Sequence, residues 1–247
     1  MSFINPIIKN ISPWKRTLLI IMRVLILILG ISIVIFGVGG TKVFGIMALL
    51  ALTIIYLPTL LNKNHLQLIP VEVEIMFLLV IIMEYILGNT FGLYGRIHHY
   101  DSFMHFTIPM MVSLIGMMFM YTAYIYGRIK TRLVIMAFLI ILITIGIGGI
   151  LEMVEYFYDQ FLYVHISHVM PTGLTQGSPT QNPLDDTMTD LFTDAIGGII
   201  GAFIGVFLIK RAEKKGHCME WVDQFARLEG FKDESEELTN DEDKSLK

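Results

Sequence analysis

The chain has 247 residues, of which 54% are hydrophobic and 16% are charged, and its mean hydropathy is +0.65. Because a soluble domain of this size carries roughly a quarter charged residues, this composition predicts a membrane protein with several spanning segments. The formal net charge is −4, and no basic stripe suggests a nucleic-acid partner. The single cysteine, Cys218, excludes an intrachain disulfide and a Cys-x-x-Cys metal or redox site.

Hydropathy predicts an all-α bundle of six transmembrane helices lying in a lipid bilayer. A basic interfacial segment, residues 1–16, comes first. The six spans are expected at about 17–39, 43–61, 70–90, 102–126, 133–158 and 186–209. Residues 210–247 are expected to form a cytoplasmic tail that is amphipathic at first, with Met219, Val222 and Phe225 on one side, and then acidic and disordered.

Several side chains within the spans have an expected local role. Arg23, near the start of the first span, is expected to reach the lipid headgroups. Glu72 and Glu74 lie in the first turn of the third span, where the helix dipole favours anions. The glycines of the sixth span recur every four residues, at Gly197, Gly201 and Gly205. They are expected to allow close helix packing.

The distribution of basic residues predicts that both termini face the cytoplasm of a bacterial cell. With the N-terminus inside, eleven Lys and Arg residues flank the inner ends of the spans, whereas only Lys42 and Arg96 flank the outer ends. The inner residues are Lys9, Lys15, Arg16, Lys63, Arg128, Lys130, Arg132, Lys210, Arg211, Lys214 and Lys215. This asymmetry follows the positive-inside rule.

With this orientation, acidic residues and one histidine from four spans fall in a single layer, the outer half of the membrane. They are Glu84, Asp101, His105, Glu152, Glu155, Asp159, Asp185, Asp186, Asp190 and Asp194. Asp159 and Asp185 are expected to be interfacial caps. Asp186, Asp190 and Asp194 are four residues apart and share a helix face, as do Asp101 and His105. Intramembrane ionisable groups are costly and mark functional sites.

So many carboxylates in a low dielectric cannot all stay ionised without compensation. Retained protons, a bound cation, or histidine and hydroxyl partners would each satisfy them. A donor set of Asp, Glu and His without Cys suits Mn²⁺, Mg²⁺, Ca²⁺, Fe²⁺ or Zn²⁺. The metal-ligand candidates are Asp101, His105, Glu155, Asp186 and Asp190. Four histidines on the outer connections could add ligands, namely His98, His99, His165 and His168. The alternative is that these groups only form hydrogen bonds between neighbouring helices.

Four motifs in residues 84–205 resemble the YjdF-type family of bacterial inner-membrane proteins, whose function is unknown. They are YDSFMHF at 100–106, EMVE at 152–155, TQG at 175–177 and the aspartate-glycine stretch at 185–201. More distantly, the chain resembles VanZ-like proteins, which are linked to glycopeptide tolerance. The resemblance implies that Asp101, His105, Glu152, Glu155, Gln176, Asp186, Asp190 and Gly197 are the family positions.

Three functions fit these observations. In the first, a divalent cation helps the protein to act on an envelope lipid or lipid-linked substrate, with Glu152 or Asp190 as general base. In the second, the protein is a proton- or cation-coupled transporter in which Glu84, Asp190 and Asp194 carry the protons. The family resemblance implies that Gln176 also belongs to the substrate site. In the third, the polar layer is structural and the protein is an accessory to an unknown partner. No complete catalytic motif chooses among them.

Overall fold

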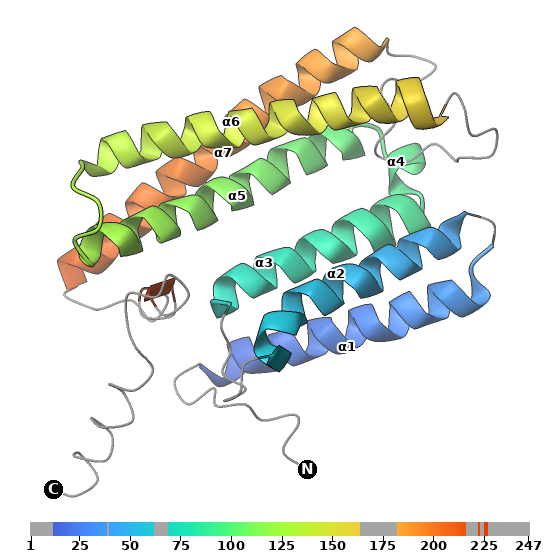
Figure 1. Ribbon diagram of the computed structural model, residues 1–247, viewed down its shortest axis with the longest axis horizontal. Coiled ribbons are helices and arrows are strands. Elements are labelled where there is room, and N and C mark those ends of the chain that lie inside the picture. Colours follow the sequence, from blue (N-terminus) through green and yellow to red (C-terminus); the bar gives the residue numbers. More distant parts are fainter. Residues whose placement is uncertain are drawn as a thin grey trace, which may run out of the picture.

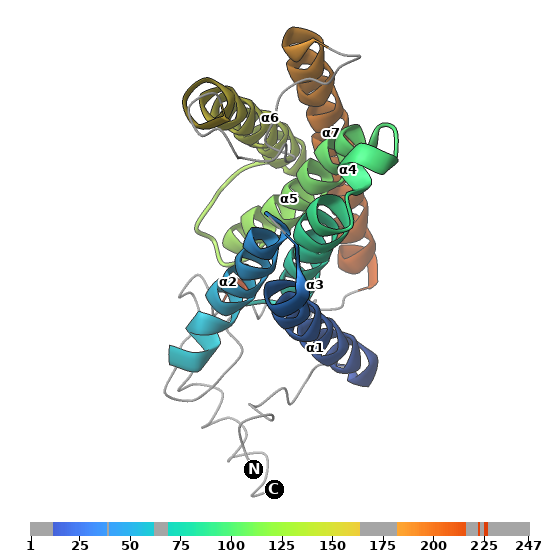
Figure 2. The ribbon, with the colours of Figure 1, turned by 90° about the vertical axis from the view of Figure 1, so that its right-hand side faces the viewer.

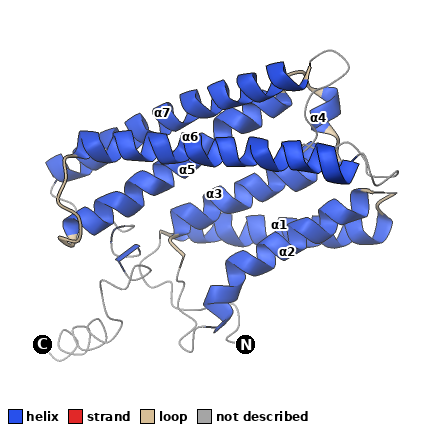
Figure 3. Ribbon diagram, turned by 45° about the horizontal axis from the view of Figure 1, so that its top comes forward, coloured by secondary structure: helices blue, strands red, loops and turns tan. Residues whose placement is uncertain are grey.

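We analysed a computed structural model of the chain, which describes residues 12–38, 40–61, 69–163 and 182–215 together with residues 222, 225 and 226. All the regular structure in these ranges is helical, as predicted (Figure 3). The order is α1 (Pro13–Phe36), α2 (Thr41–Leu61), α3 (Val71–Ile81), η1 (Ile82–Thr90), α4 (Leu93–Arg96), α5 (Tyr100–Ile125), α6 (Leu133–Phe157), η2 (Tyr158–Tyr163) and α7 (Pro183–Lys215). The two elements η1 and η2 are π-helical continuations of α3 and α6.

Four of the described helices are long and apolar enough to cross a membrane, namely α1, α5, α6 with the start of η2, and α7. The apolar part of α2 that is described, Thr41–Leu57, is shorter. α3 and η1 together carry the carboxylates Glu72, Glu74 and Glu84. Both α2 and α3–η1 nevertheless lie alongside α1 (Figure 1). Six spans therefore remain a proposal, whereas the described residues show helical structure without strands and four candidate membrane spans.

The long helices form two groups of three, α1–α2–α3 and α5–α6–α7, which Figures 1 and 2 show side by side. The first group has a core of apolar side chains that includes Leu19, Ile26 and Leu78. The second has a separate core that includes Met117 and Met136. Each group thus has its own buried apolar interior.

Glycines bring α7 into close contact with α5. A Cβ atom on Gly197 or Gly201 would collide with the backbone carbonyl oxygen of Phe106 or Met110, and one on Gly205 would lie 2.7 Å from the Cβ of Met117. The Ser113 hydroxyl, on α5, donates a 2.7 Å hydrogen bond to the carbonyl of Gly198. The predicted packing role of these glycines is confirmed, because only a residue without a side chain permits this approach.

α7 starts three residues before the expected span. Pro183 occupies its first position, and the side-chain oxygen of Asn182 accepts a 2.9 Å hydrogen bond from the Asp185 amide. This is the pattern of an asparagine N-cap followed by proline. Asn182 therefore caps the helix, and Asp186 lies inside it.

At the end where α1 begins and α7 ends, an ion pair joins α1 to α3. The Arg23 guanidinium donates to both carboxylate oxygens of Glu74, at 2.6 and 2.7 Å, and lies 4.8 Å from the Tyr56 ring centroid. Lys15 pairs with Glu72 at 2.5 Å. The expectation that Arg23 reaches the headgroups is wrong, because the buried Glu74 carboxylate provides a stronger bidentate partner.

Residues that follow α7 return to the bundle. Val222, Phe225 and Ala226 are buried, and Phe225 packs with Val73 of α3 and Met118 of α5. Val222 and Phe225, which the sequence predicts on the apolar side of an amphipathic segment, are thus buried against protein, and Met219 lies outside the described residues. Phe225 lies against both groups of helices.

Candidate functional site: a buried carboxylate–histidine cluster

Three helices place the cluster, each through residues about one turn apart. Asp101 and His105 come from the first turns of α5, Glu152 and Glu155 from the last turns of α6, and Asp190 and Asp194 from the first half of α7. Because α5 and α6 run in opposite directions, the beginning of one lies beside the end of the other (Figure 1). Helical spacing then points each pair toward the same interior.

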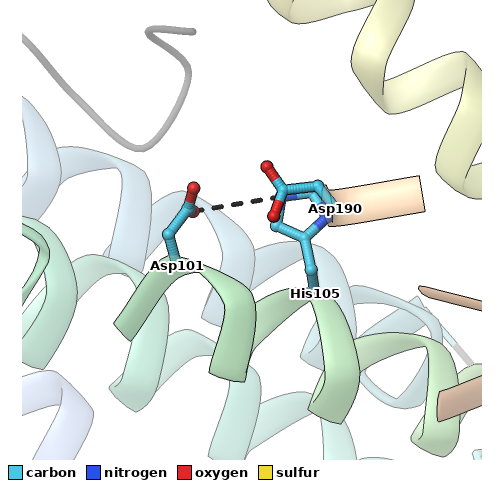
Figure 4. Close-up of side chains that lie close together, drawn as sticks. All are labelled: Asp101, His105 and Asp190. Carbon is cyan, nitrogen blue, oxygen red and sulfur yellow. Dashed lines mark ion pairs between the residues drawn. The ribbon is translucent and has the colours of Figure 1, made fainter. Parts of the chain in front are cut away.

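His105 is at the centre of the cluster. Its Nδ1 lies 3.1 Å from Asp194 Oδ1 and 4.0 Å from Glu152 Oε1, whereas its Nε2 lies 3.9 Å from Asp101 Oδ1. Figure 4 shows Asp101, His105 and Asp190 together, with Asp190 beside the imidazole ring. One imidazole therefore has carboxylates on both of its nitrogen sides.

Four carboxylates of the cluster are almost removed from solvent. Glu152 and Glu155 are 5% and 6% exposed, and Asp190 and Asp194 are 2% and 1% exposed. The Asp101 side chain, at 37%, is the most open member. Gly148 of α6 makes room for Asp194, because a Cβ at Gly148 would overlap the Asp194 carboxylate. The cluster is thus buried, with Asp101 on its open side.

Two sets of three residues have the spacing of a metal site. Ligand atoms of Asp101, His105 and Asp190 lie within 4.8 Å of one another, and so do those of His105, Glu152 and Glu155. Asp190 Oδ2 and Asp194 Oδ2 are buried and accept no hydrogen bond from the described residues. A buried carboxylate oxygen without a partner costs free energy, and a cation or a proton would remove that cost.

The contact between Asp194 and His105 has a defined chemical consequence. An imidazole that donates from Nδ1 to a carboxylate presents the lone pair of Nε2 on its other side. This is how a second carboxylate orients a metal-binding histidine in many proteins. In this cluster Nε2 lies on the side of Asp101, which belongs to the first of the two sets.

A family model described as a predicted membrane protein family, DUF2238, matches residues 19–211, which is most of the chain. The chain belongs to this family. The match confirms the predicted YjdF-type membership, whereas the more distant resemblance to VanZ-like proteins stays a prediction. No curated protein and no solved structure gives a significant match.

The other candidate residues of this DUF2238 protein lie elsewhere. Glu84 belongs to the first helix group, where its carboxylate accepts hydrogen bonds from the Tyr94 hydroxyl at 2.5 Å and the Asn89 amide at 2.8 Å. Asp186 is half-buried one turn before Asp190 and belongs to neither set of three. His98 and His99 are exposed, and their ring centroids lie 3.7 Å apart with the ring planes tilted by 51°. His165 and His168 lie outside the described residues. Gln176 lies outside the described residues.

Sequence reasoning missed the partners of two acidic residues in this DUF2238 chain. Tyr94 and Asn89 bind Glu84, and burial together with the Glu84 charge raises the pKa of the Tyr94 hydroxyl far above its ordinary value. Asn89 sits five residues after Glu84, which is the π-helical repeat, so an α-helical spacing does not place it beside Glu84. Arg23 is separated from Glu74 by 51 residues, and no local pattern pairs them.

Proposed function

We propose that the protein binds a divalent cation through Asp101, His105 and Asp190 and uses it to act on a lipid-type substrate in the outer half of a bacterial plasma membrane. The observation that supports this best is the buried Asp190 Oδ2, which has no hydrogen-bond partner among the described residues and lies beside a histidine whose Nδ1 faces Asp194. A cation would satisfy this oxygen and accept the Nε2 lone pair. Oxygen and imidazole donors suit Mn²⁺, Fe²⁺, Zn²⁺ or Mg²⁺, and waters complete their coordination.

The second set, formed by His105, Glu152 and Glu155, shares the same histidine. One imidazole has two nitrogens, and Asp194 already engages Nδ1, so a single cation on the Nε2 side is the simpler arrangement. Asp194 would then orient His105. Glu152, whose Oε1 is 4.0 Å from Nδ1, would serve as general base. Asp190 would be a ligand in this assignment, which leaves the base role to Glu152.

The proposed reaction is hydrolysis of an ester or phosphoester in the lipid headgroup region. Binding to a divalent cation lowers the pKa of water, so that its proton can pass to a carboxylate at neutral pH. Water would lose this proton to Glu152, and its oxygen would bond to the ester carbon or to phosphorus. The bond to the lipid oxygen would break, and the departing oxygen would take the proton from Glu152. Every atom of the added water thus appears in the products.

The membrane orientation is part of this proposal. The excess of Lys and Arg beside the ends where α1 begins and α7 ends supports cytoplasmic termini. The cluster lies toward the other end of the helices, so it would belong to the outer half of the bilayer. An envelope lipid of that leaflet would be within reach.

The deciding experiment is metal analysis of the purified full chain after saturation with each of Mn²⁺, Fe²⁺, Zn²⁺ and Mg²⁺ and removal of the excess. The wild type should retain about one equivalent of one of these ions. Asp190→Asn should lose it. Asp194→Asn should weaken binding by ~10–100-fold, the usual effect of removing a carboxylate that orients a metal-binding histidine.

Asp185→Asn is the matched control, because Asp185 is an exposed carboxylate on the same helix and belongs to neither set. It should bind like the wild type. If Glu155→Gln loses the ion and Asp190→Asn keeps it, the cation is bound by the second set and not by the first. Wild-type protein that retains none of the four ions would overturn the proposal and favour a structural polar layer.

A proton- or cation-coupled transporter is the second candidate function. Charged groups lie between the helices at both ends, with the buried Glu74 and the half-buried Arg23 at one end and the half-buried Glu84 near the other. The π-helical turn η1 interrupts regular α-helix beside Glu84. Transporters use such interrupted helices and groups with access from both sides. Substrate-driven proton uptake in proteoliposomes that Asp194→Asn abolishes would favour this function over hydrolysis.

A further inference from the structure

A groove runs between the end of α6 and the start of α7. It has a volume of about 490 Å³, and its lining includes Gly149, Glu152, Met153 and Tyr156 of α6 and Leu184 and Leu191 of α7. Figure 2, which looks at this end of the molecule, shows the two helices diverging here. The groove therefore lies between two membrane-spanning helices at the level of the cluster.

The walls of the groove are apolar and face outward. Met153 is 55% exposed, Tyr156 51% and Leu184 69%. In a spanning helix, apolar side chains with this exposure are in contact with lipid chains. A Cβ atom on Gly149 would meet no atom within 4 Å, so the glycine leaves open space in the wall. A hydrocarbon chain from the bilayer could lie in this space.

The lining of the groove also includes a carboxylate. Glu152 lines the groove and also belongs to the set formed with His105 and Glu155. The groove therefore joins an apolar, lipid-facing surface to the buried cluster. An occupant that fits both parts is amphipathic, with a chain along Met153 and Leu191 and a head near Glu152.

We propose that this groove admits a phospholipid of the surrounding leaflet sideways, with an acyl chain between α6 and α7 and its phosphate at the cation. This inference rests on the proposed cation site, and it names the substrate class and the route to the site. Free phosphate would not need an apolar groove, so the occupant is the lipid itself.

Charge explains why the phosphate and the cation go together. The carboxylates of the cluster outnumber its one histidine, so without a cation they would repel a phosphate group. A hard divalent cation held by oxygen ligands accepts phosphate oxygens readily. Binding of a phospholipid should therefore depend on the cation. Binding of a lipid with the same chains but no phosphate should be equally strong with and without the cation.

The test uses a phosphatidylglycerol analogue with a photoreactive group in its acyl chain, titrated into the full-length protein in detergent. Labelled peptides should include Met153, Leu184 or Leu191. Removal of the divalent cation with a chelator should raise the concentration for half-maximal labelling by about tenfold, as expected for the loss of one good polar contact. A diacylglycerol analogue with the same chains should label equally with and without the cation.

Gly149→Leu fills the groove, and Gly146→Leu is its matched control. Both glycines lie on α6, and a Cβ at either position meets no atom within 4 Å, but Gly146 does not line the groove. Gly149→Leu should weaken labelling by about tenfold and leave cation content unchanged. Gly146→Leu should leave both unchanged. If Gly149→Leu does not fold, Met153→Trp takes its place.

The outcomes separate this inference from the cation site. A bound cation with labelling that is absent from α6 and α7, or that Gly149→Leu does not weaken, overturns the phospholipid route alone. If the purified protein holds no cation and the chelator does not change labelling of the groove, the proposed cation site and the phosphate contact are both overturned. Equal cation dependence for diacylglycerol shows that the phosphate is not recognised and also overturns the inference.

Discussion

Two buried carboxylates in this protein have very different partners. Glu74 is 3% exposed and accepts two hydrogen bonds from one guanidinium, whereas Asp190 is 2% exposed and its Oδ2 accepts none from the described residues. Ionised groups in a low dielectric need compensation. Glu74 has it within the protein, so its role is structural. Asp190 would obtain it from a cation or a proton.

The pair formed by Arg23 and Glu74 allows a direct test of this distinction. Arg23→Met should destabilise the protein by ~3–5 kcal/mol, because it leaves a buried carboxylate without its countercharge. The double variant Arg23→Met/Glu74→Leu should recover most of that loss. Unfolding in mixed micelles with increasing denaturing detergent measures both. A single variant as stable as the wild type would show that Glu74 has another source of compensation.

Tyr94 provides a pH-dependent prediction at the same scale. Its pKa in the folded protein is raised by burial and by the nearby Glu84 charge, so the fold favours the neutral phenol. The stabilisation is complete below about pH 10, the ordinary tyrosine pKa, and is lost as the pH rises toward the folded pKa. Relative to Tyr94→Phe, the wild type should lose about 1.4 kcal/mol per pH unit above pH 10. Thermal unfolding of both proteins at pH 8 and pH 11 measures this difference. The same stability difference between wild type and Tyr94→Phe at the two pH values would contradict the prediction.

At the scale of elements, α7 combines two tasks on one helix. Asp190 and Asp194 lie on its early turns, and the glycines that contact α5 follow them from Gly197 onward. Because the same helix pair brings Asp194 within 3.1 Å of His105, the close glycine packing affects the geometry of the cluster. Separating α5 from α7 would disturb both stability and the cluster.

Gly201→Val tests this coupling. The new side chain would collide with the backbone carbonyl of Met110, which cannot move without displacing α5. We expect a loss of ~1–3 kcal/mol of stability and weaker cation binding. Gly146→Ala, on an open surface of α6, should be neutral or slightly stabilising. Denaturation and cation titration of both variants give the comparison. A Gly201→Val variant with wild-type stability and cation binding would show that α5 and α7 tolerate separation.

The helices and the clustered residues were accessible to sequence reasoning for different reasons. Hydropathy indicated α5, α6 and α7, because each contains a long apolar run. Polar residues at the ends of these runs, such as Arg132, Asn182 and Lys215, determine where the helices begin and end. Spacing and orientation placed Asp101, His105 and Glu152 in one layer. The partners of Glu74 and Glu84 depend on how separate helices are aligned and on a π-helical turn, neither of which leaves a periodic signal.

At the scale of the whole molecule, the two helix groups leave a cavity of about 130 Å³ at their joint. Its lining includes Glu72 and Met76 of α3, Leu114 and Met118 of α5, and Leu208 of α7. The cavity lies nearer the end where α7 finishes, away from the carboxylate–histidine cluster. The joint is thus less tightly packed than the interface of α5 with α7.

The orientation of the molecule is a separate prediction. A reporter enzyme that is active only outside the cytoplasm should be active when inserted at residues 165–180, between η2 and α7, and inactive when fused after Lys215. The reason is the excess of basic residues at the opposite ends of the helices. A cytoplasmic reporter at the same two positions is the control and should give the reverse. The reverse result with the first reporter would place the cluster toward the cytoplasm.

The position of Phe225 has a consequence for biogenesis. Its ring is 2% exposed and contacts Val73 in the first group and Met118 in the second. The ribosome adds Phe225 after every helix of both groups, so the two groups must be inserted before this contact can form. The contact that Phe225 makes with both groups therefore forms after they are inserted. A nascent chain stopped at Lys215 would have α1 to α7 but not the side chain that bridges the two groups.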